Sequence, residues 1–399
     1  MKIKRVLLVV AIFALAVWLS WITSEDPTHN QASFEEAPLT RFIASRDKAM
    51  TLAQFTNESK QTRTILVEGF DGDAVTGIDL RSVGASDSEN PFTVLRSLQS
   101  SSVDLSETGS LPKVRVSIDD LLSAAPEGSR HIGIGTNFPE HAQEARSDSV
   151  FNFPKFGLAT PPRTTISAPK DGLLDYEVEL CLRFDRPIRT LQDFDEAVKG
   201  FFICADFTDR IQLLQLADPD NLDSGYGFSD SKSGPGFFPA GPFLVIPKDW
   251  QQFIAETRMT TSLNGEPRQD ARGIEMILDF RELTEKVLGD MEAERFFYKE
   301  EFYTLAPGKF IGEDMTLMSG TSEGVIFTTP ARHDYIEILW RAIKSGAVFR
   351  WLTDRSPLMD FAIAEFIENE RAGGHFLKPG DVVVYAGGGL GDIEVKVTQ

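Results

Sequence analysis

The sequence LDYEVEL, residues 174–180, alternates apolar and acidic side chains with the two-residue period of a β-strand that has unlike faces. Glu177 and Glu179 point to the same side of such a strand, roughly 6.6 Å apart along the backbone. Two carboxylates placed in this way can chelate a hard cation such as Mg²⁺ or Mn²⁺. The acidic solvent face of a half-buried strand has the same pattern, so this stretch alone leaves both interpretations open.

Short apolar runs of the same kind recur on both sides of this stretch, and Gly/Pro turns separate them. They lie at residues 132–135, 176–182, 200–205, 243–247 and 381–386. This pattern favours a mixed, β-dominated domain (class α+β) over an array of βαβ units. The glycine-rich run 387–391 is interpreted as a hairpin turn, because too few residues follow it to build the helix of a phosphate-binding loop.

Changes in composition and in hydrophobic pattern divide the chain into segments. We expect a polar stalk at 25–60 that ends in a short helix near Arg46–Gln54, then a small β-rich N-terminal domain at 61–125, and a catalytic domain at 126–399. Within the catalytic domain, apolar residues recur at helical spacing and predict a helical pair at 333–372.

The helical pair carries apolar stripes that need a partner, since each large apolar side chain left in water forgoes roughly 1.5–3 kcal/mol. The stripes consist of Ile336, Leu339, Trp340 and Ile343, then Met359, Ile363, Phe366 and Ile367. The acidic residues Glu365, Glu368 and Glu370 argue against an anionic bilayer as that partner. We therefore expect residues 333–372 to cover the active site or to form a subunit contact.

The N-terminus predicts membrane targeting. Lys2, Lys4 and Arg5 precede an unbroken apolar run of 17 residues, Val6–Ile22, which is the lower limit of a bilayer span. We interpret residues 1–24 as an uncleaved signal anchor or transmembrane segment, with a cleaved signal peptide and a soluble exported body as the alternative. The positive-inside rule then leaves the N-terminus in the cytoplasm and the catalytic body on the extracytoplasmic, for instance periplasmic, side.

Composition excludes several classes of protein. The chain has 399 residues and a formal net charge of −20, so its surface repels phosphate backbones and nucleic acid is excluded as a partner. The two cysteines cannot build a disulfide framework or a zinc cluster by themselves. We expect the thiol of Cys181 to behave as a small buried hydrophobe.

Three further segments contain residues that could take part in catalysis or bind a metal ion. Residues 137–144 look like a helix start with proline in its first turn, which places His141 and Glu144 on one face as a candidate general base with its orienting carboxylate. A routine surface pair would look the same. Asp206 ends an apolar strand and is either a ligand or a turn residue, and Lys232 lies in a Gly/Pro loop.

Taken together and in this order, these pieces resemble the fumarylacetoacetate hydrolase family. The resemblance covers about residues 120–399. Its matching segments are GTNFPEHAQEA from Gly135, FPKF from Phe153, LDYEVEL from Leu174, CADFTDR from Cys204, KSGPGFFPAGP from Lys232, LNGEPRQ from Leu263, SGTSEGV from Ser319 and LKPGD from Leu377. It implies a mixed β-sheet roll or sandwich as the catalytic fold, below a small N-terminal domain, and a homodimer.

The resemblance also implies roles for individual residues. Glu177, Glu179 and Asp206 match the three carboxylate ligands of Mg²⁺ or Mn²⁺. His141 and Glu144 match the pair on a mobile lid that activates water, and Lys232 matches the lysine that faces the developing charge of the substrate. The substrate-binding positions fall on Arg210, Thr321 and Lys155.

The function implied is a metal-dependent hydrolase that cleaves a C–C bond in a β-diketo acid such as a 2,4-dioxo acid or acylpyruvate. Isomerisation, hydration or decarboxylation of a related 2-oxo acid at the same metal site is the first alternative. An inactive, membrane-tethered binding module is the second. The chain departs from the family pattern at Ile211, where an acid is usual, and at Ser322-Glu323, where proline is frequent. The resemblance therefore constrains the substrate less than it constrains the metal site.

Overall fold

The computed structural model describes most of the chain from residue 34 onward and little of the N-terminus. The described residues are 15, 17–19, 21, 23, 34–35, 37–98, 105, 108–147, 149–218, 221–354 and 358–399, although the side chains of 352–354 are not among them. Most of the predicted segment 1–24, and part of the predicted stalk 25–60, therefore lie outside the described residues. Among those that are described, no helix is long and apolar enough to cross a membrane.

A ten-stranded mixed sheet runs through the body of the molecule, in the order β4-β3-β2-β1-β10-β9-β8-β15-β5-β6. Its strands are β1 (Ala49–Thr56), β2 (Thr62–Phe70), β3 (Ala74–Asp79), β4 (Val114–Ser117), β5 (Arg130–Gly135), β6 (Phe151–Phe156), β8 (Leu174–Phe184), β9 (Lys199–Asp209), β10 (Phe243–Pro247) and β15 (Leu317–Met318). The two long central strands, β8 and β9, are buried on both faces. They form the floor on which the candidate site is built.

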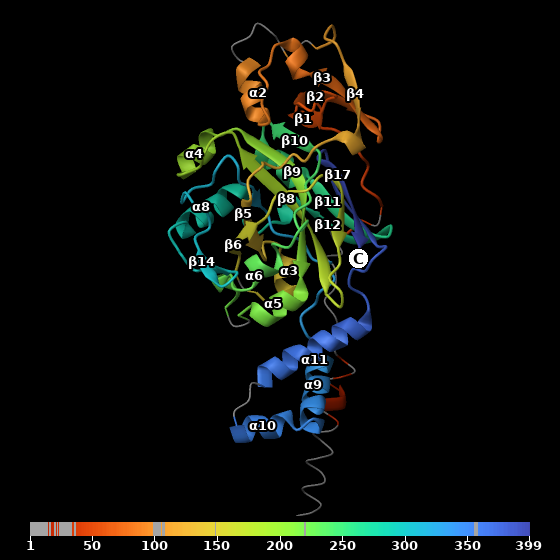
Figure 1. Ribbon diagram of the computed structural model, residues 1–399, viewed down its shortest axis with the longest axis vertical. Coiled ribbons are helices and arrows are strands. Elements are labelled where there is room, and N and C mark those ends of the chain that lie inside the picture. Colours follow the sequence, from red (N-terminus) through yellow and green to blue (C-terminus); the bar gives the residue numbers. More distant parts are fainter. Residues whose placement is uncertain are drawn as a thin grey trace, which may run out of the picture.

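A second sheet of five strands lies beside the first, and a short hairpin projects from the body (Figure 1). The second sheet has the order β12-β11-β16-β17-β7, with β7 (Arg163–Ser167), β11 (Arg258–Leu263), β12 (Glu266–Arg272), β16 (Val382–Gly387) and β17 (Gly391–Thr398). The hairpin consists of β13 (Phe296–Tyr298) and β14 (Glu301–Tyr303). Because β16 and β17 pair antiparallel across 388–390, the prediction of a hairpin turn in the glycine-rich run is confirmed.

Helices flank the sheets and in several cases begin at capping residues. Asp279 accepts hydrogen bonds from the first turn of α8, and Glu282 accepts one from the Asp279 amide, which completes a capping box. The helices are α2 (Pro91–Leu98), α3 (Pro139–Glu144), α4 (Leu191–Glu196), α5 (Arg210–Leu216), α6 (Phe228–Ser231), α7 (Trp250–Glu256), α8 (Phe280–Asp290), α9 (Arg332–Lys344), α10 (Ala347–Asp354) and α11 (Leu358–Gly373), with 3-10 turns η1 (Leu80–Val83), η2 (Ile118–Asp120), η3 (Leu222–Ser224) and η4 (Gly273–Glu275).

The N-terminal strands differ from the prediction at one segment. The segment Arg46–Gln54 is not a short helix, because residues from Ala49 onward form β1. The strands β2–β4, which lie in the predicted small domain, continue the ten-stranded sheet, because β2 pairs with β1 and β1 in turn pairs with β10 from Ala49↔Pro247 to Ala53↔Phe243. The pattern within 61–125 correctly indicated strands, but pairing partners almost two hundred residues away cannot be read from it.

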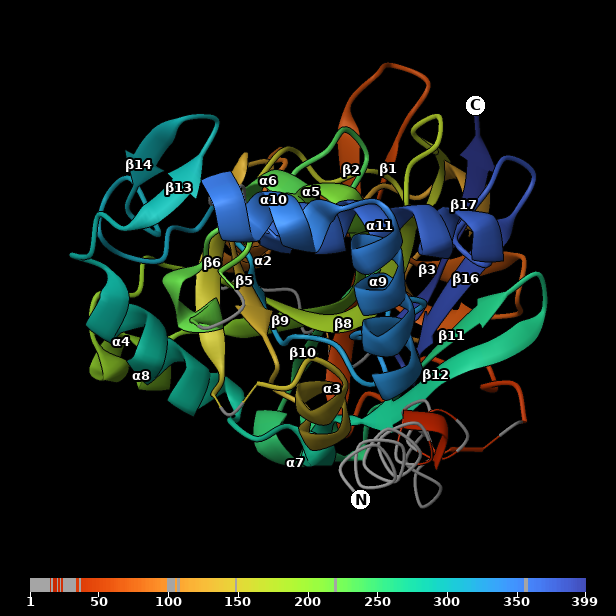
Figure 2. The same ribbon diagram turned by 90° about the horizontal axis from the view of Figure 1, so that it is seen from below.

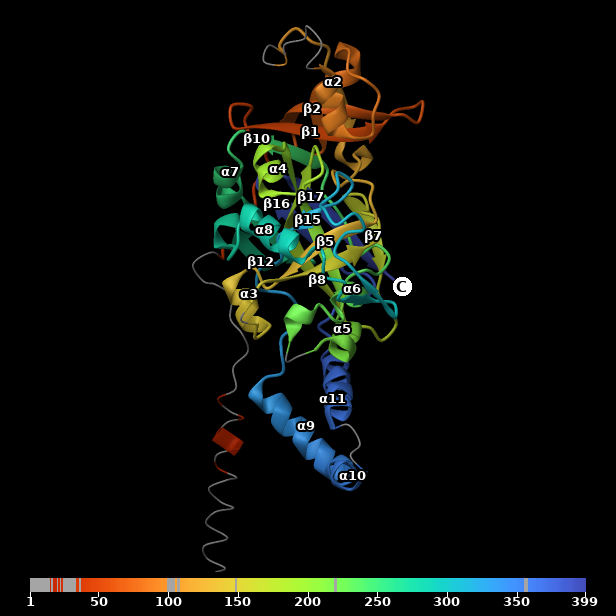
Figure 3. The ribbon, with the colours of Figure 1, turned by 90° about the vertical axis from the view of Figure 1, so that its left-hand side faces the viewer.

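The helical insertion contains three helices, α9, α10 and α11, where the sequence predicted a pair. Figures 1 and 3 show it at the opposite end of the long axis from β1–β4 and α2, and Figure 2, seen from that end, shows α9, α10 and α11 in front of the body. Only α11 packs closely on the body, through Ile363 and Ile367, which join a small apolar cluster with Ile211 and Leu214 of α5. The ring of Phe366 meets Phe327 edge to face, with their centroids 6.2 Å apart.

Candidate metal centre

The carboxylates that the sequence singled out converge because β8 and β9 pair antiparallel in a register that places Glu177 opposite Asp206. Glu179 lies one two-residue step further along the same face of β8. One oxygen from each of Glu177, Glu179 and Asp206 lies within 4.8 Å of the other two. All three residues are at most 4% exposed, so the alternative reading of a solvated acidic face is wrong.

Three buried cations surround this acidic triad. Lys232 donates from Nζ to Glu177 Oε2 at 2.5 Å, to Asp206 Oδ2 at 2.9 Å and to Thr208 Oγ1 at 2.9 Å. Lys155 donates to Asp206 Oδ1 at 2.5 Å. The structure therefore brings two residues predicted for substrate or charge stabilisation, Lys155 and Lys232, directly onto the acids.

Arg210 completes this shell from the first turn of α5. Its Nε donates to Asp175 Oδ2, and one terminal nitrogen donates to Glu177 Oε1, each at 2.8 Å. Burial lowers the pKa of Arg210, but the neighbouring Asp175 and Glu177 raise it above its usual value. The guanidinium is thus a permanent charge fixed against one side of the triad.

The charges of the cluster do not cancel. Four buried carboxylates, Asp175 with the triad, face the three cations Lys155, Arg210 and Lys232. Among the residues that the structure describes, Glu179 forms no ion pair, and its Oε2 accepts a hydrogen bond only from the Gly320 amide at 2.8 Å. Burial, together with repulsion from Asp206 and Glu177, raises the pKa of Glu179 well above its ordinary value.

A divalent cation fits this donor set. Oxygen-only ligands at a site with surplus negative charge are those that hard ions such as Mg²⁺ prefer. The repulsion that disfavours ionised Glu179 would turn into attraction once a cation lay between the three oxygens. Glu177 is already ionised in this arrangement, since Lys232, Arg210 and His141 overcome the effect of burial and hold its pKa at about 2.

The predicted His–Glu pair forms as expected on α3. His141 Nδ1 lies 3.0 Å from Glu144 Oε2, and both side chains are mostly buried. The other oxygen of Glu144 accepts a hydrogen bond from the Gly324 amide at 3.2 Å, which joins α3 to the segment that follows β15. The imidazole also contributes to lowering the pKa of Glu177 in the acidic triad.

Thr321 lies beside the triad but its hydroxyl is engaged within the protein. It donates to the Val178 carbonyl and accepts from Gln269 Nε2, each at 2.9 Å. Gln269 in turn accepts from the Val178 amide at 3.1 Å. Thr321 therefore holds the 319–324 segment against β8, and its predicted contact with a substrate carboxylate stays a prediction.

Sequence reasoning missed Asp175 and Thr208. Asp175 accepts hydrogen bonds from Arg210 and from the amides of Ile326 and Phe327, at 2.8 and 3.0 Å, and so ties β8 to the segment above the site. The signal was available, because Asp175 has the same parity as Glu177 on β8 and Thr208 has the same parity as Asp206 on β9. Side chains on the same strand face as a candidate metal ligand should therefore be counted as candidate site residues.

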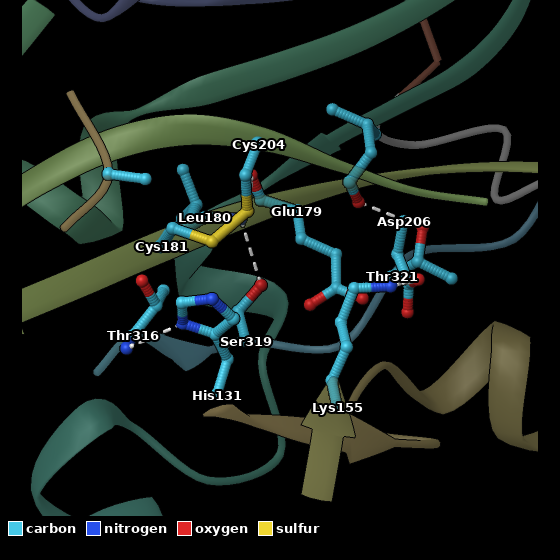
Figure 4. Close-up of a disulfide and its surroundings, with 12 residues drawn as sticks. His131, Lys155, Glu179, Leu180, Cys181, Cys204, Asp206, Thr316, Ser319 and Thr321 are labelled. Atoms are coloured by element: carbon cyan, nitrogen blue, oxygen red, sulfur yellow. Dashed lines mark hydrogen bonds and ion pairs between the residues drawn. A yellow bond between two sulfur atoms is a disulfide. The ribbon is translucent and has the colours of Figure 1, made fainter. Parts of the chain in front are cut away.

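The two cysteines form a disulfide beside the site, on the same face of β8 and β9 (Figure 4). Cys181 follows Glu179 by two residues on β8, and Cys204 precedes Asp206 by two residues on β9, with their Cα atoms 5.9 Å apart. The expectation of a free, buried Cys181 thiol is therefore wrong. Sequence separation gave no hint of this bond, which exists because the β8–β9 register brings the two side chains together on one face.

Comparisons with known proteins identify the family of this chain. Residues 130–398 match the family described as fumarylacetoacetate (FAA) hydrolase C-terminal, so the chain belongs to this family. It is 28% identical over 233 residues to a maleylpyruvate hydrolase of Aquipseudomonas alcaligenes, which is 54% of this chain and 70% of that protein. It is 25% identical over 228 residues to a fumarylacetoacetate hydrolase domain-containing protein 2 homolog of Dictyostelium discoideum, which is 53% of this chain and 67% of the relative.

Solved structures share the fold at lower identity. A fumarylacetoacetate hydrolase from psychrophilic Exiguobacterium antarcticum is 19% identical, with a TM-score of 0.54, and the match covers 88% of this chain and 99% of that one. A 2-hydroxyhepta-2,4-diene-1,7-dioate isomerase from Mycobacterium marinum is 17% identical with a TM-score of 0.51, covering 88% and 98%. The predicted family and its β-dominated α+β fold are thus confirmed.

Proposed function

We propose that this chain is a divalent-metal-dependent hydrolase that cleaves a C–C bond in a β-diketo acid of the 2,4-dioxo or acylpyruvate type. The observation that carries the proposal is the buried triad Glu177, Glu179 and Asp206, in which Glu179 has no ion-pair partner among the described residues. The hydrolase named as a relative in Aquipseudomonas alcaligenes supports the same reaction class. Mg²⁺ or Mn²⁺ is the proposed ion, held by the three carboxylates.

A bound divalent ion would supply Lewis acidity to a 1,3-dicarbonyl group and stabilise negative charge on its oxygens. The protein supplies the proton transfers. Glu144 accepts a hydrogen bond from His141 Nδ1, which leaves Nε2 as the atom that takes a proton from water. The water oxygen then adds to the distal carbonyl carbon, and the C–C bond breaks with its electron pair kept by the other fragment as an enolate.

Lys232 and Arg210 stabilise the negative charge that develops on the enolate in this step. Burial lowers the pKa of Lys232, but Asp206 and Glu177 raise it above its usual value, so the ammonium stays charged at neutral pH. A fixed positive charge next to a developing enolate lowers the barrier without any reorganisation. Protonation of the enolate carbon then releases a 2-oxo acid and a carboxylic acid, and atoms balance with one water consumed.

The test is a turnover screen of the full chain, purified with its N-terminal segment, against acylpyruvates in the presence of Mn²⁺ or Mg²⁺. We expect metal-dependent loss of the diketo acid and appearance of pyruvate or a substituted 2-oxo acid together with a carboxylic acid. Conversion to a single product of unchanged mass would replace hydrolysis by isomerisation at the same site. Absence of turnover and of metal binding would favour the binding-module alternative.

We also propose that the body of the protein lies on the extracytoplasmic side of a membrane. The support for this localisation is the disulfide between Cys181 and Cys204, because such bonds persist in oxidising compartments and are rare in the cytosol. The apolar run Val6–Ile22, preceded by three basic residues, supports the same orientation.

A further inference from the structure

The helical insertion α9–α11 exposes an unusual amount of apolar surface. Tyr335, Leu339 and Ile343 recur every four residues along α9 and are each more than half exposed, and Trp340 beside them is 58% exposed. The adjoining face of α9 carries Ile338 and Ala342, which are buried. The apolar stripe that the sequence indicated is thus divided, with one part turned inward and one part left on the outside.

This surface continues onto neighbouring segments at the same end of the molecule (Figure 3). Further exposed apolar side chains come from α10, α11 and the N-terminal segment, and together with those of α9 they make up more than half of all exposed large hydrophobic side chains that the structure describes. They are Phe349, Trp351, Met359, Leu15, Trp18, Leu19 and Trp21. Monomeric soluble proteins rarely leave a contiguous patch of this kind without a partner.

We propose that the exposed face of α9 and α10 is a membrane-docking surface that lies on the lipid interface. The first support is the placement of the N-terminal apolar segment. Arg332 donates to the Thr23 carbonyl at 2.6 Å, and the rings of Trp21 and His333 lie 5.9 Å apart. Trp21 and Thr23 therefore lie at the first turn of α9, so a chain anchored by the predicted membrane segment would carry this face to the bilayer surface.

The second support is the composition of the face. Tryptophan and tyrosine are enriched at membrane interfaces, where an apolar ring and a polar tip are both accommodated. Lys344 lies over the Trp340 ring, with Nζ 5.1 Å from the ring centroid, so a basic head sits beside an apolar body. Side chains arranged in this way extend their charge toward headgroups while their stems stay in apolar surroundings.

The third support is local charge. The whole chain carries a net charge of −20, yet residues 332–373, which span α9–α11, contain six basic residues against seven acids. This end of the molecule is thus close to neutral, so it repels anionic headgroups less than the rest of the chain does.

Two of the three acids of α11 that argued against a bilayer are neutralised within the fold. Glu365 pairs with Arg341 at 3.0 Å and Glu368 with Arg371 at 2.5 Å, while Glu370 Oε2 lies 3.0 Å from His375 Nε2. The charges of Glu365 and Glu368 are therefore compensated before the face meets a surface. The body would stand off the bilayer on α11, with β1–β4 at the far end (Figure 1).

The test uses the full chain in vesicles of phosphatidylcholine, with or without phosphatidylglycerol. Since the only two cysteines are joined in a disulfide, Leu339→Cys introduces a single reactive thiol for an environment-sensitive fluorophore. Leu158→Cys is the matched control, because Leu158 is also a leucine, is 63% exposed, and borders the cavity near Thr62 and Glu89 at the opposite end.

We expect the probe at residue 339 to shift to shorter wavelength on vesicles and to be quenched by lipids that carry a nitroxide. Phosphatidylglycerol should strengthen both effects, and Trp340→Ser with Ile343→Ser should reduce the quenching more than twofold. The probe at residue 158 should not respond. Retained Mn²⁺ binding by each variant shows that the fold is intact.

Two outcomes would overturn the docking surface. The probe at residue 339 could stay in water while the chain is bound to vesicles, or it could become buried without lipid quenching as the mass by light scattering doubles, which would assign the face to a second copy. Turnover on diketo acids is measured on the same samples, so failure of this inference and failure of the proposed reaction are distinguishable.

Discussion

Glu179 is the residue on which metal binding depends most directly, because it is the carboxylate of the triad that lacks an ion-pair partner among the described residues. We predict that Glu179→Gln weakens Mn²⁺ binding at least roughly tenfold, a loss that even the outer-shell partners of metal ligands can cause. The same variant should be at least as stable as the wild type without metal, because glutamine cannot take up the buried charge that Asp206 and Glu177 repel.

Calorimetric titration with Mn²⁺ and thermal unfolding without metal measure the two effects. Asp392→Asn is the matched control, since Asp392 is a buried carboxylate paired with Arg163 away from the triad, at 3.0 Å. It should leave Mn²⁺ affinity unchanged. Equal affinities of the wild type and Glu179→Gln would remove Glu179 from the metal site.

His141 tests the proton transfer separately from the metal. We predict that His141→Asn lowers kcat by roughly 10²–10⁴-fold, the usual contribution of a positioned general base, while Mn²⁺ affinity changes little. Steady-state kinetics on any substrate found in the screen, together with titration, give both numbers. A kcat within about threefold of the wild type would show that another group activates water.

His131 lies fully buried next to the site and makes stability depend on pH. Burial, and to a smaller extent the charge of Lys155, lowers its pKa to about 3, while the Gly157 carbonyl accepts from Nε2 at 3.1 Å. The unfolded chain binds this proton near pH 6.5 and the folded chain does not. The free energy of unfolding should therefore fall as pH drops from about 6.5 toward 3, by about 1.4 kcal/mol per pH unit from this group.

Urea titrations at a series of pH values measure this slope. His131→Gln should reduce the slope in the window between pH 3 and 6.5, whatever its effect on stability at neutral pH. An identical slope in the His131 variant would mean that other groups carry the acid sensitivity.

At the scale of elements, the β8–β9 pair determines the site. Eleven residues of each strand are matched from Leu174↔Asp209 to Phe184↔Lys199, and the disulfide adds a covalent link within this ladder. We predict that the double variant Cys181→Ala with Cys204→Ala loses about 2–4 kcal/mol of unfolding free energy, the usual contribution of a native disulfide. Its Mn²⁺ affinity should stay within about threefold, because the hydrogen-bonded ladder still positions the triad.

Denaturant unfolding with and without a thiol reductant measures the first effect, and calorimetry the second. Reductant should lower the stability of the wild type to that of the double variant and leave the double variant unchanged. If Mn²⁺ binding were lost with the disulfide, the bond would be a positioning element of the metal site in its own right.

At the scale of the whole molecule, the orientation across a membrane is the open prediction. In cells that express the full chain, we expect Cys181 and Cys204 to resist alkylation until a reductant is added to the unfolded protein. Protease added outside the permeability barrier should then cut the body. Alkylation of both thiols without reductant, with a body protected from protease, would place the protein in the cytoplasm.

Short-range patterns in the sequence were sufficient to predict the central strand, the His–Glu pair and the family. Two-residue alternation predicted β8 and the shared face of Glu177 and Glu179, and three-residue spacing predicted the His141–Glu144 pair on α3. The ordered motifs identified the family, because many short matches with compatible spacing rarely coincide. These features depend on neighbours within a few residues, which is the range over which strand and helix geometry is set.

Features that depend on contacts between distant segments became visible in the tertiary structure alone. The pairing of β1 with β10, the bond between Cys181 and Cys204, and the anchoring of Arg210 by Asp175 all follow from strand register, which no local pattern encodes. The same holds for α9, whose apolar stripe predicted burial, because a periodic pattern cannot tell a face that meets the body from a face that meets an external partner.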